Sequence, residues 1–293
     1  MKFLSGCSII KYTDYVKGKV NVMKLTYLGT AAAEGFPAIF CNCKYCIEAR
    51  KLGGKNIRTR SQALINDDLL IDLPADTYMH FLQNGIEGDK IKYLLITHSH
   101  GDHLYAGELH MRQSPYSHDE RSEKLEIYAS RGAYDKITKT GFPKSVSLSA
   151  IGAYESVSLG KYTVTALPAR HMAGDFANIY IIKGDKTLLY AHDTGFFYDE
   201  VFDFIEKQGV VFDMISLDCT NVDIPIPDSG THMGFPNIER LIARLTDIGA
   251  INSDTKKIVN HFSHNGGPLH AFLEERASEY GCGVSYDGMS VEI

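Results

Sequence analysis

Residues 97–103 read Thr-His-Ser-His-Gly-Asp-His, so three imidazoles and one carboxylate lie within one short segment. Neutral imidazole nitrogens and carboxylate oxygens are ligands that Zn(II), Mn(II) and iron accept, and alternate residues of a tight turn can face two different ions. The segment therefore predicts a site for two metal ions. The preceding residues 91–96 are apolar and rich in β-forming side chains, which predicts a buried strand with the histidines at its carboxyl end.

The length and composition restrict the class of protein. A chain of 293 residues with 44% hydrophobic residues can bury a large core, and we interpret it as one domain. The formal net charge of -6 argues against binding of a large nucleic acid, because such proteins usually carry a basic surface. No apolar run approaches the about 18 to 20 residues of a membrane span, so we expect no membrane partner.

The first 22 residues differ from the rest of the chain. They lack clear periodicity, and the first convincing strand, at 24–29, starts directly after Met23. We therefore expect residues 1–22 to be an appendage or the product of a misassigned start, and residues 23–293 to form a single domain. The segment Leu-Ser-Gly-Cys at 4–7 looks like a lipoprotein cleavage box, but the apolar stretch before it is shorter than the about 7 to 15 residues of a signal peptide. Six cysteines without an export signal then favour reduced thiols and a cytoplasmic location.

From residue 23 onward, strand and helix patterns alternate without a linker or an internal repeat. We expect helices near 76–84, 103–112, 197–207, 235–246 and 268–279. We expect further strands at 62–66, 68–72, 91–97, 125–129, 145–157, 162–167, 177–183, 186–191, 211–217, 257–261 and 284–292. Two βα halves with the sheets inside and the helices outside would satisfy this order.

The histidine motif after a strand, followed by isolated His and Asp residues that end later strands, resembles the metallo-β-lactamase superfamily. The resemblance covers residues 23–293 and implies an α/β protein with a four-layer αβ/βα sandwich and a dinuclear site at the sheet edges. By residue, it implies a first metal bound by His98, His100 and His171, a second metal bound by Asp102, His103 and His261, and a bridge from Asp193. Asp72 matches the carboxylate that orients a ligating imidazole in this family.

Several of these assignments have simpler alternatives. His171 taken alone could be a packed or surface histidine, and Asp72 could be a turn or helix-cap residue. His192 neighbours Asp193, but successive residues of a strand point to opposite faces, so only Asp193 is assigned to the metals. Four further histidines are left unassigned, namely His80, His110, His118 and His270.

A second cluster, Cys-Asn-Cys-Lys-Tyr-Cys at 41–46, places three thiols close together. Three thiolates need a fourth ligand to hold zinc tetrahedrally, and His264, three residues after His261, is the candidate. This CxCxxC with a late HxxH resembles PhnP-type phosphodiesterases of the superfamily, and the resemblance implies a structural zinc bound by Cys41, Cys43, Cys46 and His264. The alternatives are a disulfide between the second and third cysteines, or three idle thiols. We expect Cys7, Cys219 and Cys282 to be packing residues.

The residues before this cluster, Gly-Phe-Pro at 35–37, also resemble PqqB-like proteins. Those proteins share the fold and the structural zinc but lack the complete histidine motif, which this chain has. A complete ligand set favours hydrolysis over a non-hydrolytic accessory role.

Two ions roughly 3.5 to 4 Å apart would share a water, lower its pKa and present hydroxide for in-line attack, with Asp102 orienting that hydroxide. The segment Thr-His-Met-Gly at 231–234 resembles a motif of phosphodiesterase and tRNA-processing members. It implies that His232 contacts a phosphoryl oxygen or protonates the leaving alkoxide, with a helix cap as the alternative.

Together, these features predict a metal-dependent hydrolase with two zinc or manganese ions in its active site. We expect a phosphodiesterase acting on a small or cyclic phosphodiester, and a homodimer is compatible with this interpretation. The alternatives are a thioesterase or lactonase of the glyoxalase II type, which would use the same seven ligands, and a PqqB-like accessory protein. A tRNA-processing nuclease is disfavoured because the chain shows no basic, glycine-rich arm.

Overall fold

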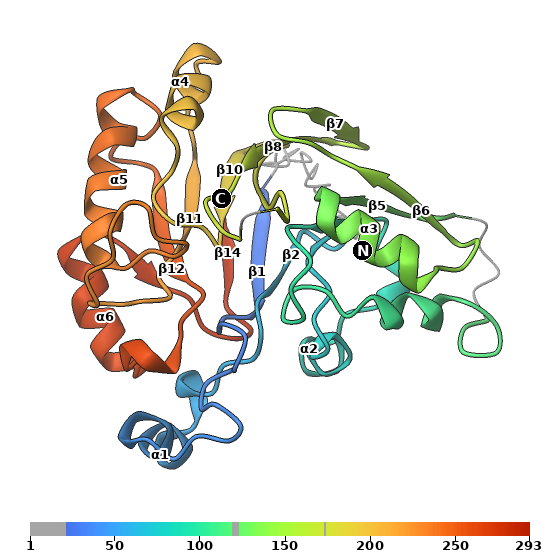
Figure 1. Ribbon diagram of the computed structural model, residues 1–293, viewed down its shortest axis with the longest axis horizontal. Coiled ribbons are helices and arrows are strands. Elements are labelled where there is room, and N and C mark those ends of the chain that lie inside the picture. Colours follow the sequence, from blue (N-terminus) through green and yellow to red (C-terminus); the bar gives the residue numbers. More distant parts are fainter. Residues whose placement is uncertain (1–21, 119–122, 173) are drawn as a thin grey trace, which may run out of the picture.

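The computed structural model describes residues 22–118, 123–172 and 174–293. The expected appendage at 1–22 lies outside the described residues except for its last residue. In the described part, two seven-stranded sheets pack face to face, and helices cover their outer faces (Figure 1). This arrangement is the αβ/βα sandwich that the sequence predicts.

The first sheet has the order β14-β1-β2-β3-β4-β5-β6. Its strands are β14 (Ser290–Glu292), β1 (Lys24–Gly29), β2 (Gln62–Ile65), β3 (Leu69–Ile71), β4 (Tyr93–Ile96), β5 (Leu125–Ala129) and β6 (Val146–Ala150). Pairing is antiparallel from β14 to β3 and parallel from β3 to β6. The carboxyl ends of β3 and β4 therefore lie side by side at one edge of the sheet.

The second sheet has the order β13-β12-β11-β10-β9-β8-β7. Its strands are β13 (Gly283–Val284), β12 (Lys256–Asn260), β11 (Met214–Asp218), β10 (Thr187–Ala191), β9 (Asn178–Lys183), β8 (Tyr162–Pro168) and β7 (Ser156–Leu159). Pairing is parallel from β13 to β10 and antiparallel from β10 to β7. The carboxyl ends of β10, β11 and β12 thus lie together, as do those of β3 and β4 in the other sheet.

Strand alternation divides the core into layers. On β9, Tyr180 and Ile182 pack between the two sheets, whereas Ile179 and Ile181 face the outer helices, as the two-residue period of a strand requires. The helices are α1 (Lys44–Leu52), α2 (Thr77–Asn84), α3 (Arg131–Thr140), α4 (Asp199–Lys207), α5 (Phe235–Asp247) and α6 (His270–Glu279). Among the described residues, none of the helices is long and apolar enough to cross a membrane.

The structure departs from the sequence-based expectations at five places. The expected strand 284–292 is two strands, β13 and β14, which lie in different sheets. The expected helix at 103–112 is a 3-10 helix over Ala106–Arg112, since the preceding residues form the histidine turn. The expected strand 145–157 is also two strands, β6 and β7, and the helices α1 and α3 were not expected.

Candidate metal centre

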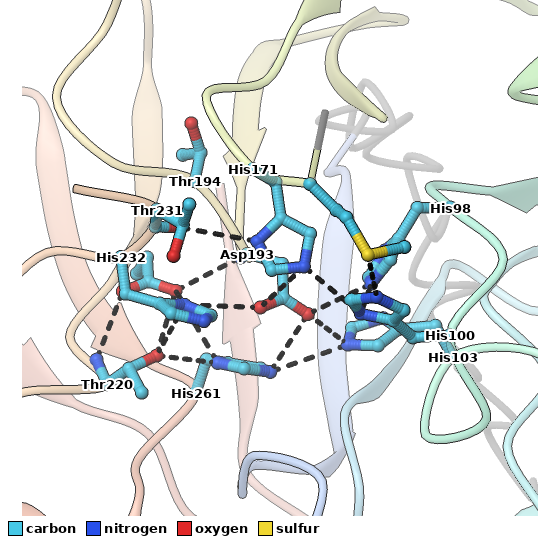
Figure 2. Close-up of polar contacts among 12 residues, drawn as sticks. His98, His100, His103, His171, Asp193, Thr194, Thr220, Thr231, His232 and His261 are labelled. Atoms are coloured by element: carbon cyan, nitrogen blue, oxygen red, sulfur yellow. Dashed lines mark hydrogen bonds and ion pairs between the residues drawn. The ribbon is translucent and has the colours of Figure 1, made fainter. Parts of the chain in front are cut away.

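The seven expected metal ligands come from separate segments that meet where strands end. Figure 2 labels all of them except Asp102. The turn at 97–103 follows β4, and His171 lies three residues after β8. Asp193 follows β10 by two residues, and His261 follows β12 directly. The structure brings all of these ligands together, and it divides them into two groups whose ligand atoms lie within 4.8 Å of one another.

The first group contains His98, His100 and His171. The His100 Nδ1 atom lies 3.0 Å from His98 Nε2 and 3.1 Å from His171 Nε2. Ligand atoms of a tetrahedral zinc site with bonds of about 2.0 to 2.1 Å are roughly 3.3 Å apart. The spacing of these nitrogens therefore fits a single divalent ion.

The second group contains Asp102, His103, Asp193 and His261, which are all buried. The His103 Nε2 atom lies 3.4 Å from Asp102 Oδ2 and 3.4 Å from His261 Nε2. The same tetrahedral spacing applies here, so this group also fits one divalent ion.

Asp193 stands between the two groups. Its Oδ2 atom lies 3.4 Å from the Nε2 atom of His98, 2.5 Å from that of His103 and 3.2 Å from that of His261. This oxygen is buried, and the nitrogens around it belong to imidazoles of both ligand groups. Neutral imidazoles with their Nδ1 protons engaged elsewhere cannot satisfy a buried carboxylate, whereas cations shared with them would. The residues thus fit a carboxylate-bridged pair of ions.

Backbone conformation supports a specialised role for three residues at these strand ends. Asp72, Asp193 and His261 have φ values of 67°, 52° and 64°, in the left-handed region that non-glycine residues rarely adopt. Each such residue costs of order 1 to 3 kcal/mol, and strained residues of this kind cluster at functional sites.

Asp72 orients the histidine turn, as the family resemblance implies. Its Oδ2 atom lies 2.7 Å from His103 Nδ1, and its Oδ1 atom accepts hydrogen bonds from the amide and hydroxyl of Thr97. His98 Nδ1 lies 3.0 Å from the same hydroxyl. Both Nδ1 atoms are engaged away from the cluster, which leaves the Nε2 atoms for metal. The cap alternative for Asp72 is wrong, because Asp76 is the N-cap of α2.

Asp218, at the end of β11, is a functional residue that the sequence analysis missed. Its carboxylate accepts hydrogen bonds from the backbone amides of Asp193 and Met233 and from the hydroxyl of Thr220. That hydroxyl lies 2.8 Å from His261 Nδ1. Asp218 therefore holds the backbone of the bridging residue and, through Thr220, the orientation of His261. Its position at the end of a buried strand was the available signal.

The buried charges control protonation in this cluster. Burial opposes charge on His261, but Asp193 and Asp218 raise its pKa to about 10. Burial likewise opposes ionisation of Asp193, but His261 and His103 hold its pKa well below the usual range. Burial also opposes ionisation of Asp102, but the nearby His103 lowers the pKa of that carboxyl. Metal binding has to displace the imidazole protons and is expected to release them.

We expect Asp218→Asn to weaken metal binding by about 10- to 100-fold, the usual effect of losing a carboxylate that orients ligands. Asparagine keeps the shape of the side chain but offers an amide to groups that need an acceptor. Competition with a chromogenic chelator would measure the change. Asp213→Asn is the matched control, because Asp213 pairs with Lys186 outside the site. Equal metal affinity in Asp218→Asn and the wild type would contradict this role.

His232 lies beside the bridging carboxylate. Its Nδ1 atom is 3.2 Å from Asp193 Oδ1 and 3.2 Å from Asp218 Oδ2, and its ring stacks on that of His261 with centroids 5.8 Å apart. Burial opposes charge on the imidazole, but Asp218 raises its pKa overall. The side chain keeps 26% of its surface exposed. The cap alternative is wrong, because Gly234 is the N-cap of α5.

The cysteine cluster forms a separate group in which the ligand atoms of Cys41, Cys43, Cys46 and His264 lie within 4.8 Å of one another. The His264 Nδ1 atom is 3.9 Å from Cys43 Sγ and 3.6 Å from Cys46 Sγ. A tetrahedral zinc site with Zn–S bonds of about 2.3 Å needs separations of roughly 3.6 to 3.8 Å. The cysteines are free thiols, and the Cys46 amide and His264 lower the pKa of Cys43 to about 6, which favours the ligating thiolate.

Histidines left unassigned on sequence grounds lie outside the candidate metal groups. His192 is buried, with Nε2 2.7 Å from Ser216 Oγ and Nδ1 3.1 Å from Asn260 Nδ2. Both ring nitrogens of the buried His80 are also engaged, Nε2 with Thr59 Oγ1 and Nδ1 with Gln62 Oε1. These two side chains are accounted for by packing and hydrogen bonding.

A cleft of about 390 Å³ opens onto the metal centre. Its lining includes His100, Asp102, His171, Asp193 and His232. A small substrate can therefore reach both ligand groups and His232 at the same time.

Comparisons with known proteins agree with this fold. A model of the beta-lactamase superfamily domain matches residues 70–262. A diphosphatase of the PhnP family has a TM-score of 0.71 at 22% identity, over 93% of this chain and 97% of its own. Zn(2+)-bound PqqB from Methylobacterium extorquens has a TM-score of 0.67 at 19% identity, over 92% of this chain and 100% of its own. The short form of human tRNase Z has a TM-score of 0.60 at 16% identity, over 92% of this chain and 98% of its own. No curated protein matches the sequence.

The structural likenesses are below 25% identity and establish the fold alone. The family model matches well over half of the chain and contains every candidate ligand of the dinuclear site, including Asp193 and His261. This chain therefore belongs to the metallo-β-lactamase superfamily of metal-dependent hydrolases.

Proposed function

We propose that this protein is a phosphodiesterase for small or cyclic phosphodiesters, with two zinc or manganese ions at the dinuclear centre and one structural zinc. The observation that carries the proposal is the position of His232 Nδ1, 3.2 Å from the bridging Asp193. A thioesterase or lactonase would use the same seven metal ligands without needing an imidazole there.

When bound, the two ions would lower the pKa of a water and stabilise the charge that grows on the phosphoryl oxygens. The protein's own contribution is positioning and proton transfer. Asp102 lines the cleft, where its carboxylate can accept a hydrogen bond from the attacking water. His232 also lines the cleft, and its Nδ1 atom is held by Asp218, so the other ring nitrogen is available to the leaving oxygen.

The comparisons support this choice of chemistry. Two similar structures are described as a diphosphatase and a tRNase, names that refer to reactions at phosphorus. A third is described as Zn(2+)-bound, which supports zinc as one of the metals. The cysteine cluster needs thiolate ligands, and we propose a reducing compartment, the cytoplasm, for this protein.

A substrate panel tests the proposal directly. Protein loaded with Mn(II) or Zn(II) is offered bis-p-nitrophenyl phosphate, a 2′,3′-cyclic nucleotide, a ribose cyclic phosphate and a thioester. We expect turnover of diesters and none of the thioester. Efficient thioester hydrolysis would favour the glyoxalase II type, and no turnover of any ester by the fully loaded protein would favour a PqqB-like accessory role.

We expect His232→Ala to keep its bound metal but to lose about 10²- to 10⁴-fold in kcat on an alkyl phosphodiester, the usual contribution of a positioned acid or base. The loss should be smaller on a p-nitrophenyl diester, whose leaving group needs little protonation. His118→Ala is the control, because His118 is exposed and lies outside the cleft. Equal losses on both substrates would show that His232 is not a general acid.

A further inference from the structure

A second and larger cleft, of about 710 Å³, adjoins the metal cleft. The two clefts share His171, a candidate ligand of the first metal. Its volume falls within the range of about 300 to 1,000 Å³ that is typical of small-molecule sites. Any substrate with its phosphate at the metals and a bulky substituent therefore has space for that substituent here.

Phe176 lines this second cleft under unusual conditions. Its side chain is 69% exposed, and its backbone has a φ of 52°. A bulky aromatic residue in the left-handed region is a genuine outlier, and exposing its ring forgoes burial. The exposed ring does not stabilise the hydrophobic core, so neither cost is offset by packing. This points to a role for the ring in binding.

The residue before it fixes the loop that carries Phe176. Asp175 is buried, and its Oδ2 atom accepts a hydrogen bond of 2.9 Å from the Ser99 amide in the histidine turn. Its carbonyl accepts a hydrogen bond of 3.2 Å from the Gly132 amide at the start of α3. A Cβ at Gly132 would overlap with Asp175. The Phe176 backbone is thus fixed relative to the metal centre.

A second aromatic ring in the cleft is also held in place. The guanidinium of Arg170 lies 3.9 Å from the ring centroid of Tyr198, and Arg170 Nε donates to the Phe196 carbonyl at 2.8 Å. Two polar side chains of the lining are already engaged, since Asn178 Nδ2 donates to the Ile151 carbonyl and Glu155 accepts from the Gly152 amide. Arg131 also lines the cleft, and its Nε atom pairs with Asp135. The cleft therefore combines aromatic surface with one guanidinium group.

We propose that this cleft, called the base cleft below, binds the nucleobase of a nucleotide diester whose phosphate lies at the metal centre. The inference rests on the proposed phosphodiesterase function and names its substrate class. A planar base gains from stacking on Phe176 without requiring specific polar partners, and every base has a suitable face. A sugar without a base lacks the planar face that stacks on Phe176.

Binding can be tested without catalysis, because the chain has no tryptophan. Phe176→Trp introduces a single tryptophan into the base cleft, whose fluorescence can be excited selectively over that of the tyrosines, and adenosine or thymidine 5′-monophosphate is titrated against ribose 5-phosphate. We expect saturable quenching by both nucleotides and none by the sugar phosphate. Phe272→Trp, on α6, is the control for non-specific absorption by the nucleotides. Equal quenching in both variants, or quenching by ribose 5-phosphate, would overturn the proposal.

Kinetics provide the second test. Thymidine 5′-(p-nitrophenyl phosphate) and methyl p-nitrophenyl phosphate share the leaving group and differ in the nucleoside. We expect Phe176→Ala to reduce kcat/KM on the first by about 5- to 150-fold, the value of one stacked base, and to change the second less than about twofold. Phe272→Ala should change neither. A similar loss on both substrates in Phe176→Ala would mean a general defect and would overturn the proposal.

The two proposals can fail separately. If no diester is hydrolysed but the tryptophan in the base cleft is quenched by nucleotides alone, the phosphodiesterase function is wrong and nucleobase binding is right. If diesters are hydrolysed but the nucleoside gives no advantage and no quenching, the base cleft is wrong and the phosphodiesterase function is right.

Discussion

Asp193→Asn should leave the fold intact but reduce the metal bound at the dinuclear centre from two ions to at most one, with kcat reduced by at least about 10³-fold. The reason is that Asp193 Oδ2 lies within 3.4 Å of imidazoles from both ligand groups. An amide is a poor bridge between cations, and the charge stabilisation supplied by a metal pair is worth several kcal/mol, where each 1.36 kcal/mol is tenfold in rate.

Metal content by elemental analysis and the rate on bis-p-nitrophenyl phosphate would be measured together. Asp213→Asn again serves as a control, because it removes a carboxylate that directly precedes β11 and pairs with Lys186 outside the site. Asparagine keeps the shape of the buried side chain but removes its negative charge, so the packing should be preserved and the variant should fold. Two ions bound with wild-type affinity in Asp193→Asn would show that this residue does not bridge them.

The ligands of the metal centre could be predicted because their chemistry is local in sequence or tied to strand ends. The turn at 97–103 can be identified as a metal site from its residue types alone. The other ligands follow strands, and parallel strands bring their carboxyl ends to one edge of the sheet. Asp193 and His261 each follow an apolar run that is readable as a strand. The strand pattern and the family resemblance were therefore enough to place them.

Asp218 could not be assigned in this way, although it too ends a strand. Its partners, Asp193 and His261, are 25 and 43 positions away, and only the neighbouring places of β10, β11 and β12 in the sheet bring the three together. An aspartate at a strand end is equally suited to a turn, so its role depends on the order of strands. Sequence periodicity carries no information about that order.

Two helices and one strained residue were also not predictable from local sequence. Helix α1 begins at Lys44, inside the cysteine motif, so its pattern was interpreted as a metal site alone. Helix α3 has a cap signal, since the Ser130 hydroxyl accepts from the Ala133 amide, but its polar sequence gave a weak helical pattern. The positive φ of Phe176 depends on the fixed position of Asp175 against Ser99, a contact between distant segments. Such features require the folded chain.

The four residues 261–264 connect the two kinds of candidate metal site. His261 belongs to the dinuclear group and His264 to the cysteine group. Between them, Phe262 exchanges backbone hydrogen bonds of 3.0 Å with Thr30 and Ala32. The Phe262 ring also lies 4.6 Å from the guanidinium of buried Arg58. The cysteine group therefore holds one end of a segment whose other end supplies a ligand to the active site.

Cys43→Ser should accordingly destabilise the protein far more than it impairs catalysis. If zinc is present at about 1,000 times its dissociation constant, losing the site removes about 4 kcal/mol of folding free energy. That corresponds to a fall in melting temperature on the order of 10 °C for a domain of this size. The kcat at low temperature should fall less than tenfold, because Thr30, Ala32 and Arg58 still hold Phe262.

Thermal melting with and without added zinc, together with zinc content, would check this expectation. Cys282→Ser is the matched control, because Cys282 is a free thiol outside the cluster whose Sγ faces the Tyr280 carbonyl. The control should keep its zinc and its response to added zinc, whereas Cys43→Ser should lose both. A melting temperature of Cys43→Ser equal to that of the wild type would mean that the cluster holds no structural metal. A normal melting temperature with lost activity would instead assign the cysteines to catalysis. A structural zinc site that only stabilises the fold cannot be lost without a fall in melting temperature.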